Sequence, residues 1–413
     1  MSDYIWTRPS LSPILPDAKH LGELKDMAQE LYTASAAMEG SIALETARQL
    51  GERLRFVNSY YSNLIEGHKT TIPEIERALS RDFSDKPERR YAQELCAAHV
   101  LTEREIMGKL FESPDQNVCQ PSYLSEIHRK FYGHLPPEHQ FTHHAGGFSA
   151  IPVMAGEFRD LEVSVDGRTQ HGPDARDLPG VMESFAKESD PAVFHGDERL
   201  IVAAVSHHRL TWLHPFRDGN GRLARLHTGL YLARSKVNRA NLWSLSRGFS
   251  RNKGGYMLNL LATDSPGQPE DEVFFDAALT ADFCRFFFEI CLDQIGFMRQ
   301  LLKLEEVERR IEWLVSTLIH GRMPQLAPES SRLLRAVFRR GAVPRGEAPE
   351  IVGKPERTTR RTVIAPLLNA GLLLSSSHRA PLCMGLPVPA LPYLFPGLFD
   401  PAVVGEEYRE LIV

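Results

Sequence analysis

One segment constrains the fold of this 413-residue chain more than any other, His-Pro-Phe-Arg-Asp-Gly-Asn-Gly-Arg-Leu-Ala-Arg at positions 214–225. Apolar residues recur at helical spacing over 197–213 and again through Arg234, and a proline and two glycines interrupt them. The pattern predicts two helices joined by a tight loop. Gly219 and Gly221 allow backbone N–H groups to turn inward, and the second helix points its positive end at the same place. The loop is therefore predicted to bind an anion.

The charged residues of this segment indicate which anion would fit. Arg222 and Arg225 lie three apart on one helix face, where their guanidinium groups can hold further phosphate oxygens. Phosphate would repel Asp218 unless a divalent cation lay between them, and Mg²⁺ commonly binds one carboxylate together with substrate phosphates. These residues predict a nucleotide–Mg²⁺ complex as the ligand. His214 has a reference pKa near neutrality, so it is the candidate base for an attacking hydroxyl.

Taken singly, these residues also fit ordinary roles, with His214 as a helix cap and Gly-Asn-Gly as a turn. Together they resemble the defining motif of the Fic family, His-Pro-Phe-x-(Asp/Glu)-Gly-Asn-Gly-Arg-x-x-Arg, at every specified position. The resemblance implies an AMP transferase that uses ATP and Mg²⁺. It implies these roles: His214 as base, Asp218 as Mg²⁺ ligand, Gly219, Asn220 and Gly221 as anion hole, and Arg222 and Arg225 as contacts to the triphosphate.

The same resemblance suggests roles for residues 252–260 and for His207. Residues 252–260, with Tyr256 and Asn259, resemble the family segment that borders the adenine pocket. His207 falls where family members often carry a histidine. A histidine inside a helix is more often a hydrogen-bonded core residue than a catalyst, so His207 is expected to be part of the scaffold.

A short β-hairpin is predicted ahead of the motif, at Gly156–Arg159 followed by 161–167. Its apolar/polar alternation and its terminal Asp-Gly are typical of such a turn. In Fic proteins a flap at this place pairs with the backbone of the target protein by strand addition. The resemblance therefore implies a target-docking flap; a hairpin with a purely structural role is the alternative. The flap residues would be Leu161, Glu162, Val163, Ser164 and Val165.

Far upstream, Ser62-Asn63-Leu64-Ile65-Glu66-Gly67 alone would be the end of an amphipathic helix with a glycine cap. In a chain that carries the Fic motif, it matches the inhibitory pattern (Ser/Thr)-x-x-x-Glu-(Gly/Asn), with Ser62, Glu66 and Gly67 at the specified positions. The resemblance implies that Glu66 pairs with Arg225 and occupies the place of the γ-phosphate. Because the pattern precedes the motif, it resembles the class whose inhibitory helix is N-terminal and intramolecular.

The remaining chain is mainly helical, so the expected fold is a Fic helical bundle with a short β-hairpin flap and a C-terminal winged helix-turn-helix domain. Expected domains are an N-terminal helical region over 1–112, a catalytic domain over 113–320 and a winged-helix domain over 325–413. In the last of these, a helix stopped at Gly341, a short second helix and a third from about Glu356 to Asn369 precede two apolar segments around a polar turn. Pro366 is expected to kink or shorten that third helix.

The C-terminal region is basic, which keeps a DNA-binding regulator open as an alternative function. Residues 331–380 hold ten arginines and lysines against three glutamates, a local charge of +7. Arg357, Arg360 and Arg361 lie on the third helix, where a groove-reading helix would carry them. A winged helix used for dimerisation or for target docking is the other interpretation, and a homodimer is left open.

Bulk properties exclude several other classes. The formal net charge of −5 argues against attraction of the whole chain to nucleic acid or anionic membrane. The five cysteines contain no Cys-x-x-Cys pair, and the chain carries no basic-then-apolar leader and no uncharged membrane-length run. A cytoplasmic protein without a membrane partner is expected. Its partner would be a protein that bears an acceptor hydroxyl; removal of AMP, or transfer of another phosphate-containing group, stays open as the reaction.

Overall fold

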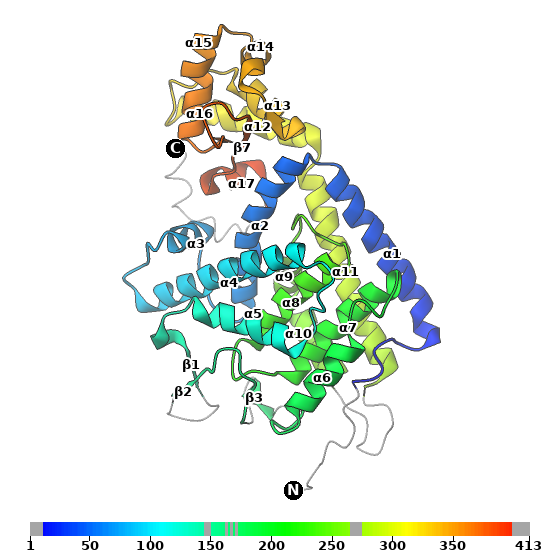
Figure 1. The fold of residues 1–413 in the computed structure, drawn as a ribbon. Helices are drawn as coiled ribbons and strands as arrows, with labels where there is room; N and C mark the ends of the chain where they lie inside the picture. Colours follow the sequence, from blue (N-terminus) through cyan, green and yellow to red (C-terminus); the bar gives the residue numbers. More distant parts are fainter. Residues whose placement is uncertain are drawn as a thin grey trace.

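The computed structural model describes residues 11–143, 150–161, 164–165, 168–169, 172–264 and 275–398. Within them the fold is mainly α, with small antiparallel sheets, as predicted (Figure 1). The helices before residue 321 are α1 Ala18–Gly40, α2 Leu44–Ile65, α3 Ile72–Leu79, α4 Pro87–Glu112, α5 Pro121–Gly133, α6 Leu178–Glu188, α7 Asp197–Leu213, α8 Asn220–Arg234, α9 Leu245–Arg251, α10 Lys253–Thr263, α11 Ala277–Leu301 and α12 Leu304–His320.

The predicted helix boundaries around the motif are confirmed. α7 begins at Asp197 and ends at Leu213, and α8 ends at Arg234. Both helices are buried along most of their length, and they pack against each other, so the loop between them is anchored on two core elements. Further along, α11 ends at Leu301 and α12 begins at Leu304. Arg310 Nη2 of α12 donates to the Leu301 carbonyl at 2.5 Å and so satisfies an acceptor at the end of α11.

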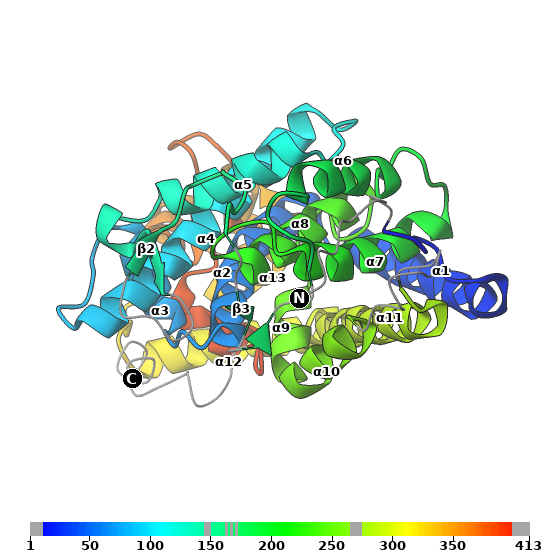
Figure 2. The ribbon, with the colours of Figure 1, turned by 90° about the horizontal axis from the view of Figure 1, so that it is seen from below.

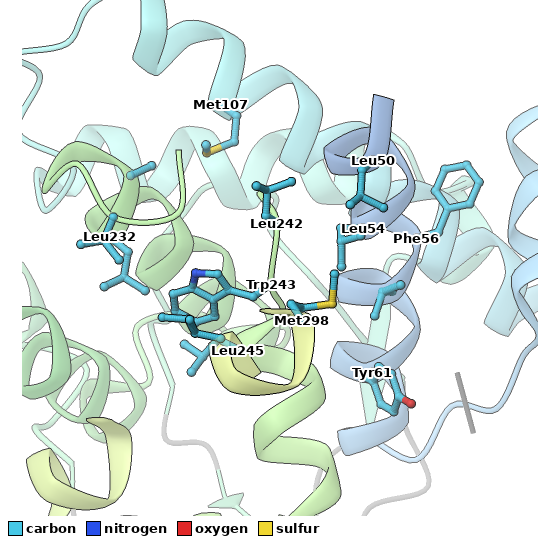
Figure 3. Packing of buried hydrophobic residues seen from close by; sticks show 14 of the residues in the cluster. Leu50, Leu54, Phe56, Tyr61, Met107, Leu232, Leu242, Trp243, Leu245 and Met298 are labelled. Atoms are coloured by element: carbon cyan, nitrogen blue, oxygen red, sulfur yellow. The ribbon is translucent and has the colours of Figure 1, made fainter. Parts of the chain in front are cut away.

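α2 lies at the centre of the core. Leu50 and Leu54 on its buried side, together with Trp243 and with Met298 of α11, belong to one hydrophobic cluster, seen from close by in Figure 3. α2 packs against α4 and α9, whereas α1 packs along α11 and α7 (Figure 2). The next helix, α3, begins with a capping box, in which Thr71 and Glu74 satisfy each other's backbone N–H groups. The helix end that carries Glu66 is therefore supported on several sides.

Two hairpins precede the motif. β1 (Phe141–His143) pairs with β2 (Ala150–Pro152), and β3 (Ser164–Val165) pairs with β4 (Arg168–Thr169), both antiparallel. A hairpin is thus present where one was predicted, but its strands lie on either side of the Asp-Gly dipeptide. Gly156–Arg159, expected as its first strand, is a turn and an extended segment. The β1–β2 pair was not predicted. All four strands lie at the same end of the molecule (Figures 1 and 2).

The C-terminal region forms a small unit at the opposite end (Figure 1). Its elements are α13 Ser330–Arg340, β5 Ala342–Val343, α14 Ala348–Val352, α15 Glu356–Thr359, α16 Ala365–Asn369, β6 Leu373–Leu374, β7 Leu382–Met384 and α17 Leu391–Leu394, with a sheet of order β5-β7-β6. The expected three helices and hairpin are found in the expected order; the winged-helix class itself stays a prediction. Pro366 does not end the third helix, because a π-helical turn over Arg360–Ile364 precedes it and joins α15 to α16.

In the described part of the chain, every helix is too short or too polar to cross a membrane. The five cysteines are free: Cys383 is half-buried on β7, and Cys96, Cys119, Cys284 and Cys291 are buried. Burial raises the pKa of the Cys96 thiol to about 12. Cys96 thus behaves as a small hydrophobic residue in the core.

Candidate active site

The loop between α7 and α8 is closed by its own asparagine. His214 adopts a left-handed backbone φ of 46°, which turns the chain at the end of α7. Asn220 then bonds Phe216 twice: its Oδ1 accepts from the Phe216 N–H at 2.9 Å, and its Nδ2 donates to the Phe216 carbonyl at 2.8 Å. The Asn220 amide is therefore used to hold the turn, and its backbone N–H at the start of α8 is the group that can meet an anion.

A second support, Arg159, was not predicted as a site residue. Its side chain is buried; the backbone N–H donates to the Pro215 carbonyl at 2.8 Å, and Nε donates to the His214 carbonyl at 3.0 Å. Its guanidinium also donates to the Leu161 carbonyl at 3.3 Å and the Pro173 carbonyl at 2.5 Å. Arg159 thus ties the motif loop to the segment that leads into β3. The residues around Arg159 in the sequence do not indicate this supporting role, because its hydrogen-bond partners lie in separate segments of the chain.

Asp218 is oriented from α5. The Tyr132 hydroxyl donates to Asp218 Oδ2 at 2.7 Å. His128 Nδ1 accepts from the Gly156 N–H at 2.8 Å, so its Nε2–H donates to the Asp218 carbonyl at 3.1 Å. Burial lowers the pKa of His128 to about 4, which keeps this imidazole neutral, and its ring stacks on Phe216. Two α5 side chains therefore hold Asp218, Tyr132 at its carboxylate and His128 at its backbone carbonyl.

The first turn of α8 forms a cradle beside Asp218. Gly219 caps the helix with a φ of 77°. Arg222, one turn on, has a side chain only 5% exposed and lies 3.5 Å from Asp218 Oδ2. Its Nε and Nη1 have no hydrogen-bond partner among the described residues. A buried guanidinium with unpaired N–H groups is costly, and a bound anion would satisfy them.

Glu66 lies against the same cradle. Its Oε1 is 2.5 Å from Arg225 Nη2, and Ser62 completes the contact by accepting from Arg225 Nε at 2.9 Å and, through its carbonyl, from Nη2 at 3.0 Å. The pairing of Glu66 with Arg225 is present as the family resemblance implied. Burial alone would raise the pKa of Glu66, but Arg225 and Arg222 outweigh it and hold this pKa below its usual value. Glu66 therefore stays ionised and bound to Arg225 at neutral pH.

His214 has the tautomer that a base needs. Its Nδ1 is 3.3 Å from the Thr211 carbonyl, so Nδ1 carries the proton and Nε2 keeps its lone pair. Burial lowers the pKa of His214, and the bond to Thr211 only partly opposes this. The imidazole is therefore neutral at pH 7 and can accept a proton.

The segment that contains this loop is similar in sequence to known proteins. The model of the Fic/DOC family matches residues 118–232, which run from before α5 into α8 and contain the whole loop. Residues 118–232 form a Fic domain. A protein of Nematostella vectensis named protein adenylyltransferase Fic is 27% identical over 230 residues, which cover 53% of this chain and 45% of the relative. Its namesake in Drosophila mojavensis is 27% identical over 228 residues, which cover 54% and 39%.

The chain therefore spans less than half the length of these curated relatives. A solved structure of a Fic domain containing signaling protein from Bacteroides thetaiotaomicron is similar in fold, with a TM-score of 0.51 and 18% identity, over 66% of this chain and 95% of the other. This structural likeness bears on the fold alone.

Tyr256, expected beside the adenine, lies in the core behind the Fic motif. Its side chain is 1% exposed, and its hydroxyl is 2.8 Å from His207 Nε2. His207 Nδ1 is 2.7 Å from Thr228 Oγ1, so this buried histidine links α7, α8 and α10 as a scaffold residue. Asn259 is half-buried on α10 and donates to the Gly255 carbonyl at 2.9 Å. Contact of either residue with a base stays a prediction.

Three of the five predicted flap residues are among the residues that the structure describes. Leu161 is half-buried, Ser164 and Val165 form β3, and Glu162 and Val163 lie outside the described residues. β3 pairs with β4 alone, so its other edge has no strand beside it among the described residues. The carbonyl contact from Arg159 connects this segment to the Fic motif.

The side chains at the cradle could hold Mg²⁺ only if a bound nucleotide supplied further ligands. The described residues contain no group of three or more His, Cys, Asp or Glu side chains that could hold a metal ion. Asp218 contributes one partly exposed carboxylate at the cradle edge. Mg²⁺ is commonly held by one or two carboxylates plus substrate phosphates, so Asp218 would hold the ion through a bound triphosphate.

Proposed function

We propose that this protein transfers AMP from Mg·ATP to a hydroxyl of a protein and that Glu66 restrains the transfer. The observation that carries the proposal is the position of the Glu66 carboxylate. It lies between Arg225 and the first turn of α8, a place where a helix N-terminus and arginines would otherwise receive phosphate. A carboxylate that occupies an anion site mimics the ligand it excludes.

The chemistry follows from the side chains around the cradle. His214 Nε2 takes the proton from the acceptor hydroxyl, whose oxygen attacks the α-phosphorus of ATP; the bond to the bridging oxygen breaks, and pyrophosphate leaves. The Arg222 guanidinium and the N–H groups of the first turn of α8 stabilise the charge on the phosphate oxygens. Mg²⁺, when bound at Asp218, would offset the charge of the leaving pyrophosphate.

Glu66 opposes this reaction by competing for Arg225. While the ion pair holds, ATP either loses one contact to its γ-phosphate or binds with its α-phosphate out of line. The restraint needs no second molecule, because Ser62 and Glu66 belong to the same chain as the Fic motif. Intramolecular autoinhibition is the form of regulation that this contact supports.

The acceptor is proposed to be a protein because Arg159 ties the loop to the segment that leads into β3, whose second edge has no strand beside it among the described residues. The edge of β3 opposite β4 can receive an extended segment by main-chain hydrogen bonds, which places a side-chain hydroxyl without a demand for a particular sequence. Self-modification is included in this proposal.

Labelled ATP tests the reaction type. The protein is incubated with Mg²⁺ and ATP labelled at either the α- or the γ-phosphate, and its intact mass is measured. AMP transfer gives label from the α position and a mass gain of one AMP, and His214→Ala gives neither. Label from the γ position alone would overturn the proposal in favour of phosphoryl transfer.

Removal of AMP is the second candidate, because Glu66 could also orient a water molecule toward an AMP–protein bond. The Glu66 side chain is one-third exposed, so water can reach it. The two reactions respond in opposite ways to loss of this carboxylate. On a protein already carrying AMP, Glu66→Gly would stop release of AMP if removal is the function and would increase label if transfer is the function.

A further inference from the structure

The basic residues of the C-terminal unit divide into two groups that the sequence does not distinguish. On α13, Arg335 pairs with Glu312 and Arg339 with Glu308 of α12, while Arg340 pairs with Glu347 at 2.6 Å. In the turn before α15, Lys354 pairs with Glu329 at 3.0 Å. These four cations each have a carboxylate beside them, mostly on α12 or just before α13, so they contribute little to the field outside the molecule.

The second group has no acidic partner. Arg357, Arg360 and Arg361 on the helix Glu356–Asn369 and Arg379 in the β6–β7 turn are all exposed, and none forms an ion pair with another described residue. Of the ten basic residues over 331–380, these four lie on one helix and in one hairpin turn. The other two without an acidic partner, Arg332 and Arg345, donate to backbone carbonyls of the unit. We call Arg357, Arg360, Arg361 and Arg379 the arginine face.

The surroundings of the arginine face indicate what kind of partner fits. α14 and α15 lie at the end of the molecule that is farthest from β1, β2 and β3, so the face is not covered by the catalytic part (Figure 1). The exposed side chains of the helix are Glu356, Arg357, Arg360, Arg361, Ala365 and Asn369, without a large apolar residue among them. A membrane-binding helix would need such residues, so the composition disfavours a lipid surface.

We propose that the arginine face binds the backbone of double-stranded DNA, with the helix Glu356–Asn369 in the major groove and the β6–β7 turn against the adjacent phosphates. The major groove of B-DNA is about 12 Å wide and admits one α-helix of this diameter. All four cations are arginines, whose planar guanidinium groups match phosphate oxygens and guanine edges. On the supporting helix α13, Arg335, Arg339 and Arg340 are paired with carboxylates, whereas the arginine face has no such partners.

The charges set the expected salt dependence. Four phosphate contacts predict a slope of log K against log salt of about −3.6, hence a loss of affinity on the order of 10²-fold between 50 and 200 mM salt. Binding that rests on the overall charge of the chain is not expected, since the formal net charge is −5. The prediction is thus specific to the arginine face.

The test measures binding of the full chain to a fluorescently labelled 25-base-pair DNA duplex of mixed sequence. Fluorescence anisotropy gives the affinity at each of several salt concentrations. Arg357→Gln with Arg361→Gln should reduce the slope by about two and weaken binding at least tenfold at low salt. Arg335→Gln with Arg339→Gln removes the same charge from the paired group and should leave the slope unchanged. Melting temperatures establish that both variants are folded.

Three results would overturn the proposal. The full chain could show no salt-dependent binding to the duplex, the two double variants could lose affinity equally, or a poly-glutamate peptide or a phosphatidylserine vesicle could compete better than the duplex. The last result would assign the arginine face to an acidic protein or to a membrane. None of these results depends on whether the Fic domain transfers AMP, so they leave the proposed function untouched.

Discussion

At Gly221 the missing side chain allows Glu66 to reach the first turn of α8. A Cβ on this residue would lie 2.4 Å from Glu66 Oε1 and 3.2 Å from Arg225 Nη1, which is too close for any side chain. Glycine at position 221 therefore allows the Glu66 carboxylate to lie against the first turn of α8. Under the proposed function, this carboxylate and a phosphate of ATP would compete for that place.

Glu66→Gly is expected to increase AMP transfer. The change frees Arg225 and removes a like-charge clash with phosphate; a relief of about 1 to 3 kcal/mol would raise the active fraction on the order of 10- to 100-fold. Self-modification with α-labelled ATP measures it, and Glu66→Gln tests whether charge alone suffices. A folded variant that binds ATP without a gain in transfer would reduce Ser62–Gly67 to an ordinary helix end.

His214 should set the acid limb of the pH profile. The neutral imidazole is the active form, and its pKa is lowered, mainly by burial, so activity is lost only as pH falls through a value below 6.5. The profile of kcat/KM for the Glu66→Gly variant measures that midpoint. His214→Ala in the same background should lower kcat by ~10²- to 10⁴-fold while Mg·ATP affinity is kept. A midpoint above 6.5 would contradict the assignment of His214 as base.

α2 positions Glu66 from several turns away. Asn58, Ser62 and Glu66 follow each other at four-residue spacing and so lie on one face of the helix end. At the upper end of this face Glu103 of α4 accepts three bonds at Oε1, from Arg55 at 3.2 Å, Asn58 at 3.0 Å and Asn241 at 3.1 Å. At the lower end Lys253 Nζ donates to the Ile65 carbonyl at 2.6 Å. The rotation of α2 is therefore fixed at both ends.

A small cavity lies beside this face of α2. It has a volume of about 50 Å³ and is lined by His99, Glu103, Arg225 and Trp243, among others. Both ring nitrogens of His99, Glu103 Oε2 and Trp243 Nε1 have no hydrogen-bond partner among the described residues. Unpaired buried polar groups around a space of this size are typically bridged by ordered water. Arg225 thus contacts Glu66 and also lines this polar cavity.

Glu103→Gln should weaken inhibition through α2. The amide keeps an acceptor but cannot replace the carboxylate that accepts from Arg55, Asn58 and Asn241, so we expect α2 to be held less firmly and Mg·ATP affinity to rise several-fold. With Glu66→Gly in the same chain, the change should have no further effect. Titration calorimetry on both single variants and the double variant measures this, and Glu188→Gln, at a half-buried carboxylate away from α2, is the control. Equal effects in the two backgrounds would show a general loss of stability instead.

At the scale of the whole molecule, the C-terminal unit and the Fic domain share a core. One hydrophobic cluster extends from Leu11 to Leu398. Thr46 of α2 donates to the Phe338 carbonyl at 3.0 Å, and Arg247 donates to the Gly397 carbonyl at 2.8 Å. α2 therefore contacts the C-terminal unit with its first turn and Arg225 of α8 with its last. The expected boundaries at 112, 320 and 325 fall near helix ends and stay predictions.

Removal of residues 325–413 should destabilise the remaining chain. The cut exposes buried side chains on α2 and removes the carbonyl partners of Thr46 and Arg247; a loss of ~3 kcal/mol would lower Tm by roughly 5 °C or more. Hydrogen exchange should increase along α2. Scanning calorimetry and exchange mass spectrometry measure both quantities. An unchanged Tm with unchanged protection of α2 would mean that the two parts are independent.

Features that depend only on residues close together in the sequence could be predicted from the sequence alone. The loop at 214–221, the helices on either side of it and the order of elements after Ser330 follow from backbone preferences and apolar spacing within short segments. The same locality explains the misplaced hairpin. Asp-Gly predicted a hairpin, and β3 and β4 lie on either side of this dipeptide. Apolar alternation also extended through Gly156–Arg159, but there Arg159 bonds the Pro215 and His214 carbonyls and no strand partner.

Contacts between distant segments could not be obtained in this way. Glu66 was paired with Arg225 through a family resemblance, because nothing in either segment specifies a partner 159 residues away. The Tyr256 hydroxyl bonds His207, Arg159 connects the loop to the segment that leads into β3, and Glu103 accepts from three donors. Burial and hydrogen-bond partners of this kind are decided only when the helices pack together. Local chemistry therefore specified an anion cradle and its base, whereas packing of α2 against α4, α8 and α10 put a carboxylate inside that cradle.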